Sequence, residues 1–149
     1  MKFSTRTLYG LRAVFVLASR FGEGSLSVSQ IARREGISVA YLEQILNALK
    51  KKGMVKSVRG PQGGYALSKK PSEITLKYLF DSFEGAWPHG TGQALTDADE
   101  VKIADYLFWK TMRSSLDGGL SAMSLKELMD QARRTKKSKS TAVQAPFHI

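Results

Sequence analysis

The stretch that decides the fold runs from residue 38 to residue 67 and reads SVAYLEQILNALKKKGMVKSVRGPQGGYAL. Its first half predicts a helix with one buried face, because apolar side chains recur at positions i, i+3, i+4 and i+7. These side chains are Leu42, Ile45, Leu46 and Leu49. Ser38 is a suitable N-cap for this helix, and Gly53 suits the turn that ends it.

The second half of the stretch has the pattern of a β-hairpin. Residues 54–58 form a short run with β-branched valines, residues 59–64 read RGPQGG, and residues 65–67 can return as a second strand. A turn rich in glycine and proline between two short apolar runs is typical of a hairpin.

Two further helices are predicted upstream of this stretch. The first covers the apolar run 8–21, with Ser4 as its N-cap, and ends at Gly22-Glu-Gly24. Its expected buried face consists of Leu8, Leu11, Phe15 and Ala18, widened by Val14, Leu17 and Phe21. The second begins after Ser27 or Ser29 and ends at Gly36. Three helices followed by a hairpin are the winged helix-turn-helix plan, so we expect a mostly α fold with a small β-hairpin.

The polar face of the third helix suits the major groove of DNA. At about 100° per residue, the side chains opposite the apolar face are Ala40, Gln44, Asn47 and Lys51, with Tyr41 and Glu43 beside them. Gln44 and Asn47 can each read adenine through two hydrogen bonds, and Glu43 can accept one from cytosine. Ser38 and Tyr41 can reach phosphates at the start of the helix. An ordinary amphipathic helix with a polar outer face is the alternative.

The turn of the hairpin carries a candidate for the minor groove. Arg59 stands at its tip beside Gly60, Gly63 and Gly64. An arginine on a wing can enter a narrow minor groove, and glycines allow the backbone to approach a duplex closely. The same glycines would also serve plain turn geometry in any hairpin.

The block 41–65, YLEQILNALKKKGMVKSVRGPQGGY, resembles the signature of the Rrf-two family of bacterial transcription regulators. LYGLRA at 8–13 and SLKEL at 124–128 also match the family pattern, so the resemblance covers residues 1–134. It implies a homodimeric winged-helix repressor or activator that binds double-stranded DNA at a pseudo-palindromic operator. It also implies that the recognition helix faces DNA through Ser38, Ala40, Tyr41, Glu43 and Gln44, and that Arg59 enters the minor groove.

Many members of this family hold an iron–sulfur cluster on three cysteines in the loop before a long helix. The corresponding loop here, residues 85–96, reads GAWPHGTGQALT, and the 149 residues contain no cysteine. A cysteine-ligated cluster is therefore excluded, and no cofactor is expected. His89 with Asp97, Asp99 and Glu100 is an alternative metal site of nitrogen and oxygen ligands. Solvated carboxylates at a helix start explain the same residues more simply.

Three more helices are expected: from Ser72 or Thr75 to Phe83, from Asp97 to Leu116, and from Ser124 to Arg134. The long one has almost no polar side, since it contains Val101, Ile103, Ala104, Tyr106, Leu107, Phe108, Trp109 and Met112. A helix that is apolar nearly all round in a small protein is expected to bury a second face in a partner. We therefore interpret it as a dimerisation helix.

Trp87, His89 and Trp109 are candidate ligand-binding residues for a small-molecule effector. Core or interface positions are the alternative for the two tryptophans. A protein effector that docks on the acidic segment 72–132 is another possibility.

Charge divides the chain into three parts. Residues 1–71 hold 13 basic and 3 acidic side chains, residues 72–132 hold 5 and 10, and residues 133–149 hold 5 and none. A basic first part indicates a partner that is a polyanion. We expect a DNA-binding domain at 1–71, a linker helix, loop and dimerisation helices at 72–134, and a basic disordered tail at 135–149.

Other classes of protein share some of these sequence features. An RNA-associated winged-helix protein would share the basic face. An enzyme is not expected, because His89 and His148 are the only histidines and no set of nucleophile, base and orienting residue can be assembled. Apolar stretches fall short of the roughly 18 residues that span a membrane, and Arg12 interrupts the N-terminal run too early for a signal peptide. We expect a cytoplasmic protein without a membrane partner.

Overall fold

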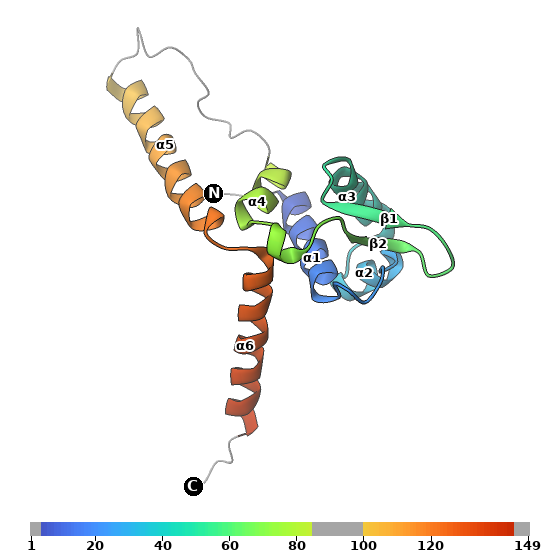
Figure 1. Cartoon of the computed structure of the whole chain (residues 1–149). Helices are drawn as coiled ribbons and strands as arrows, with labels where there is room; N and C mark the ends of the chain where they lie inside the picture. The colour runs from blue at the N-terminus through green and yellow to red at the C-terminus, as the bar shows by residue number, and fades with distance from the viewer. Residues whose placement is uncertain (1–3, 85–99, 145–149) are drawn as a thin grey trace.

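Six α-helices and a two-stranded hairpin make up residues 4–84 and 100–144, the part of the chain that this computed structural model describes (Figure 1). The helices are α1 (Thr5–Ser19), α2 (Val28–Glu35), α3 (Val39–Lys51), α4 (Leu76–Glu84), α5 (Glu100–Ser121) and α6 (Leu125–Gln144). The strands are β1 (Val55–Val58) and β2 (Gly64–Leu67), and a 3-10 turn covers Pro71–Glu73.

The first three helices begin at serines, as predicted. The Ser4, Ser27 and Ser38 hydroxyl oxygens accept hydrogen bonds from the third residue beyond each, at 3.1, 3.1 and 3.3 Å. Each bond satisfies a backbone N–H that has no partner inside its helix. Helix α2 ends at Gly36 with φ 66°, and α3 is followed by Gly53 with φ 74°. This left-handed conformation favours glycine, so both predicted helix ends are confirmed.

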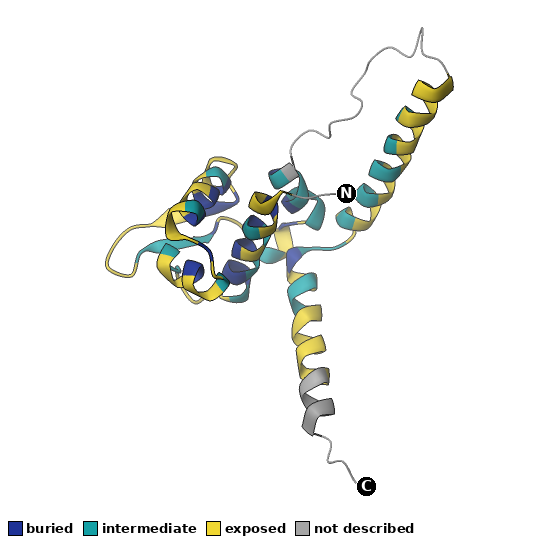
Figure 2. Cartoon of the chain, turned by 180° about the vertical axis from the view of Figure 1, so that it is seen from behind, coloured by how far each residue is buried: buried dark blue, intermediate teal, exposed yellow. Residues whose placement is uncertain are grey.

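The core lies between α1, α2, α3, α4 and the hairpin, where buried residues gather in Figure 2. The predicted buried face of α3 is confirmed, because each of its four side chains is at most 2% exposed: Leu42, Ile45, Leu46 and Leu49. Leu125, at the start of α6, is also fully buried in this core.

The predicted buried face of α1 is partly wrong. Leu8 is 49% exposed and Phe21 is 47% exposed. Val14, Leu17 and Ala18 are buried as predicted, and the buried face also includes Thr7 and Gly10. Gly10 lies against α4, since a Cβ atom there would collide with the ring of Phe83 on that helix. A pattern of apolar side chains overlooks a glycine whose function is to let a neighbouring helix approach.

Strands β1 and β2 pair antiparallel, with Val55 opposite Leu67 and Val58 opposite Gly64. Leu26 extends this hairpin by one bridge, because its N–H donates to the carbonyl of Tyr65 (3.0 Å) and its carbonyl accepts from the Tyr65 N–H (2.8 Å). Gly64 permits this approach, since a Cβ atom at that position would collide with the carbonyl of Leu26. The segment before α2 thus anchors the hairpin to the helices.

Helices α5 and α6 project from the body in Figure 1. Their connection is attached to the segment before α4, because the Leu76 N–H donates to the Met123 carbonyl (2.9 Å) and the Leu125 N–H donates to the Ile74 carbonyl (2.7 Å). Of the two predicted caps for α4, Thr75 is the one used, and it accepts from the Tyr78 N–H at 3.1 Å. In residues 4–84 and 100–144, no helix combines the length and apolarity needed to cross a membrane.

Both projecting helices end later than predicted. Helix α5 continues past Leu116 to Ser121, and α6 continues past Arg134 to Gln144. The expectation of disorder is therefore wrong for residues 135–144, while residues 145–149 lie outside the described part. The sequence contains neither glycine nor proline from residue 125 to residue 145, and lysine, alanine and glutamine favour helix. Asp130 supports the first turns by pairing with Lys126 (2.6 Å) and Arg133 (3.0 Å).

Candidate DNA interface

Helix α3 presents the polar face that the sequence predicts. Its outward side chains are all exposed: Ala40, Glu43, Gln44, Asn47 and Lys51. Ser38 is exposed at the N-cap, where backbone N–H groups and the helix dipole favour an anion. Tyr41 is half-buried, and its ring packs edge-on against the ring of Tyr9, with centroids 6.0 Å apart. The structure therefore brings every predicted α3 residue to one face or its border.

The turn of the hairpin holds Arg59 in an exposed position. Gly60 has φ 117°, a value that favours glycine, and its carbonyl accepts from the Gly63 N–H at 2.9 Å. A Cβ atom on Gly63 would lie 2.5 Å from the Val58 carbonyl oxygen. Turn geometry is sufficient to explain both glycines, and a close approach of their backbone to a duplex stays a prediction. Arg59 is the exposed arginine at the tip of this wing.

Long-range hydrogen bonds that no local sequence pattern predicts hold the wing. The Ser25 hydroxyl, from the loop before α2, donates to the Gln62 carbonyl at 2.7 Å. These two residues are 37 positions apart, so no local pattern could connect them. Together with the bridge between Leu26 and Tyr65, this bond restrains the wing tip relative to the body.

Side chains also join the wing to α3. The Tyr65 hydroxyl donates to Asn47 Oδ1 at 3.3 Å, and Lys50 Nζ donates to Ser57 Oγ at 2.9 Å. Ser57 and Tyr65 are paired across the two strands, so both hydrogen bonds to α3 start from the same residue pair of the hairpin. The sequence holds one indication of these contacts. Side chains alternate along a strand, which places Ser57 on the same side of β1 as Val55. Helix α3 and the wing thereby form one connected surface.

The electrostatics of residues 4–71 favour a polyanion. Two of the three acidic side chains here are in ion pairs, Glu23 with Arg20 (2.5 Å) and Glu35 with Arg12 (3.3 Å). The third, Glu43, lies on the polar face of α3. The remaining basic side chains therefore leave a surplus of positive charge around α3 and the wing.

The candidate effector residues are not brought together in the described part of the chain. Trp87 and His89 lie outside it, as do Asp97 and Asp99 of the alternative metal site. Trp109 lies on α5, where its Nε1 donates to Asp105 Oδ1 at 3.1 Å. Within residues 4–84 and 100–144, no three histidine, aspartate or glutamate side chains gather as they would around a metal ion.

Comparisons with known proteins agree with this geometry. The family model described as "Rrf2: Iron-dependent Transcriptional regulator" matches residues 3–131. The chain is 35% identical over 128 residues to the HTH-type transcriptional regulator CymR of Bacillus subtilis (strain 168), which covers 86% of this chain and 89% of that protein. It is 33% identical over 133 residues to the HTH-type transcriptional regulator IscR of Aliivibrio salmonicida (strain LFI1238), covering 87% and 77%.

Two solved structures are similar along most of their length. T. potens IscR matches with a TM-score of 0.71 and 35% identity, covering 89% of this chain and 88% of that chain. CymR (YrzC), the global cysteine regulator of B. subtilis, matches with a TM-score of 0.72 and 34% identity, covering 88% and 98%. The chain belongs to the Rrf2 family: it is a DNA-binding transcription regulator with a winged helix-turn-helix fold, and not an enzyme.

Proposed function

We propose that the protein is a homodimeric repressor that binds a pseudo-palindromic DNA operator in the cytoplasm. The observation that carries the proposal is that the exposed face of α3 and the Arg59 wing are tied into one surface. A helix and a wing held at a constant separation suit a major groove and the adjacent minor groove of one duplex.

The roles of the side chains follow from their chemistry. Gln44 reads an adenine edge with its amide, and Glu43 accepts a hydrogen bond from a cytosine amine. Ser38 and Tyr41 contact phosphates at the start of α3, where the helix dipole adds to the attraction. Ala40 leaves room for a base edge, Lys51 contacts a phosphate, and Arg59 enters the minor groove.

Dimerisation is proposed from the surface of α5. No residue of this helix, described in full, is buried in the single chain, and Figure 2 shows it mostly exposed. Val101 is 77% exposed, Leu107 50% and Phe108 56%. Removing this apolar surface from water favours association with a second copy. Two-fold symmetry would then set two α3 helices one DNA turn apart, about 34–36 Å.

The signal that controls the protein is proposed to act without a cysteine-ligated cluster. The family is described as iron-dependent, whereas these 149 residues offer no thiolate ligand. The donor set therefore does not fit such a cluster. A small molecule near Trp87, His89 and Trp109, or a protein bound to the acidic segment 72–132, remains the proposed type of effector.

Selection of bound duplexes from a random DNA pool, at two salt concentrations, tests the function. We expect enrichment of a two-fold symmetric site with A·T-rich positions where the Arg59 wings lie. Binding that is sensitive to salt but does not select a sequence would contradict the proposal, because it would reflect phosphate contacts alone. Repression is then tested by placing the selected site in a reporter promoter. We expect lower expression of the reporter when the protein is present.

A further inference from the structure

Asn47 lies between the reading face of α3 and the wing. It is exposed and shares a stripe with Gln44, one turn earlier. Its Oδ1 accepts a hydrogen bond from the Tyr65 hydroxyl at 3.3 Å. Tyr65 is itself restrained, because both its backbone N–H and its carbonyl are bonded to Leu26.

A second hydrogen bond fixes the position of the hairpin relative to α3. Lys50 Nζ donates to Ser57 Oγ at 2.9 Å, and Ser57 is the strand partner of Tyr65. Two hydrogen bonds therefore connect the third turn of α3 to one cross-strand residue pair of the hairpin. The wing thus orients the Asn47 amide before any DNA is bound.

This orientation matters because an asparagine reads adenine with both amide atoms. Its oxygen accepts from the adenine N6 amine while its nitrogen donates to N7, and both atoms must face the base edge in one plane. The bond to Tyr65 directs Oδ1 toward the hairpin and leaves Nδ2, with two N–H donors, for the groove. Guanine offers two acceptors there, O6 and N7, whereas adenine places its own N6 donor beside Nδ2.

We infer that Tyr65 changes Asn47 from an adenine reader into a hydrogen-bond donor that favours guanine at one position of each half-site. The inference rests on the proposed function, because it requires α3 in the major groove. Tyr65 is then a positioning residue for specificity: it contacts no base and acts through the amide that it holds.

The test compares four variants on duplexes that carry each base in turn at every operator position. Asn47→Ala identifies the position that Asn47 reads, because discrimination disappears there. Tyr65→Phe removes only the hydroxyl, and the double variant shows whether its effect passes through Asn47. Tyr78→Phe is the matched control: the Tyr78 hydroxyl donates to the Lys52 carbonyl at 3.3 Å, so it also ties another element to the end of α3. Thermal melts confirm that each variant is folded.

We expect Tyr65→Phe to raise the ratio of adenine to guanine affinity at that position about five-fold or more, the scale of one bidentate base contact. Tyr78→Phe should leave the ratio unchanged, and the double variant should behave as Asn47→Ala. An unchanged ratio in Tyr65→Phe, or the same shift in the Asn47→Ala background, would overturn the inference while the operator itself stands. If the unmodified protein selects no symmetric site, the proposed function fails and the inference fails with it.

Discussion

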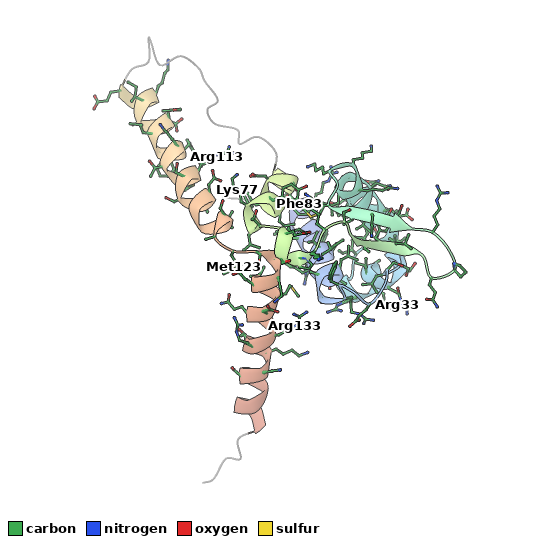
Figure 3. All side chains as sticks on the ribbon, in the orientation of Figure 1. Arg33, Lys77, Phe83, Arg113, Met123 and Arg133 are labelled. Carbon is green, nitrogen blue, oxygen red and sulfur yellow. The ribbon has the colours of Figure 1, made fainter. Side chains whose placement is uncertain are left out.

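Lys77 on α4 connects the DNA-binding body to α5 through Asp117. Lys77 Nζ lies 2.6 Å from Asp81 Oδ2 and 3.4 Å from Asp117 Oδ1, and Arg113 approaches Asp117 at 3.7 Å. Lys77 and Arg113 come from the facing helices α4 and α5 in Figure 3. The hydrogen bond to Asp81 is the largest of the effects that raise the pKa of Lys77. The ammonium group of Lys77 thus joins α4 to the proposed dimerisation helix.

Lys77→Met tests this connection. It retains the apolar stem but leaves Asp81 and Asp117 without the ammonium group between them. Because partly exposed ion pairs are weak, we expect little change in the melting temperature. Local opening of α5 should become more frequent, so we expect faster hydrogen exchange at residues 113–121. Lys110→Met, on the same helix, is the control, since the Lys110 ammonium lies over the Tyr106 ring of its own helix. Equal exchange in both variants would mean that the ion pair does not hold α5.

Gln44→Ala is expected to weaken discrimination at one operator position by about 1–3 kcal/mol, because it removes a bidentate base contact. Competition binding with single-base variants of the selected operator measures this effect. Gln131→Ala, an equivalent change at an exposed position of α6, should leave binding unchanged. Unaltered affinity and base preference in Gln44→Ala would show that this side chain does not read DNA.

Arg59→Ala should weaken binding most on operators with A·T-rich flanks, because a narrow minor groove attracts arginine most strongly. Titrations with A·T-rich and G·C-rich flanks measure the difference. Arg20→Ala, which removes an exposed arginine at the end of α1, provides the comparison. An equal loss on both kinds of flank would assign Arg59 to phosphate contact instead.

Phe108→Glu is expected to convert the dimer to monomer at micromolar concentration. The side chain is 56% exposed in the single chain, so the change costs little in folding but places a charge in the proposed interface. Sedimentation equilibrium gives the mass directly. Lys110→Glu adds a carboxylate to the same helix and should stay dimeric. Should Phe108→Glu remain a dimer, α5 is not the interface.

Stability near the start of α6 should depend on pH through Glu127. Its Oε2 accepts from the Ser124 N–H at 2.7 Å, and this bond lowers the pKa of Glu127 below its ordinary value of 4.5. The carboxylate therefore adds stability above pH 4.5, which is lost as the pH falls through the lowered pKa. Glu127→Gln keeps an acceptor but does not titrate. Urea unfolding should show the largest difference between the two proteins at neutral pH and a smaller one in acid; a constant difference would refute this.

Local chemistry explains how much of the fold was predictable. Ser38 begins α3 by accepting a hydrogen bond from a residue three positions later. Gly36 and Gly53 end α2 and α3 through their own positive φ angles. The spacing of the apolar side chains in α3, together with the helical repeat, was enough to predict its buried and polar faces. The polar face is the candidate site. The buried face of α1 was predicted less well, because Gly10 contributes to it by being small.

The remaining features depend on residues that are distant along the chain. The sequence indicates that Asn47 is polar and outward-facing, but only the folded hairpin brings the Tyr65 hydroxyl to its amide oxygen. Likewise, Ser25 meets Gln62, and Lys77 meets Asp117, only after the helices have packed. Helix caps and periodicity act over one or two turns, so they can be seen in a linear sequence. Long-range pairs form because core packing positions whole elements, and this arrangement determines which polar atoms become neighbours.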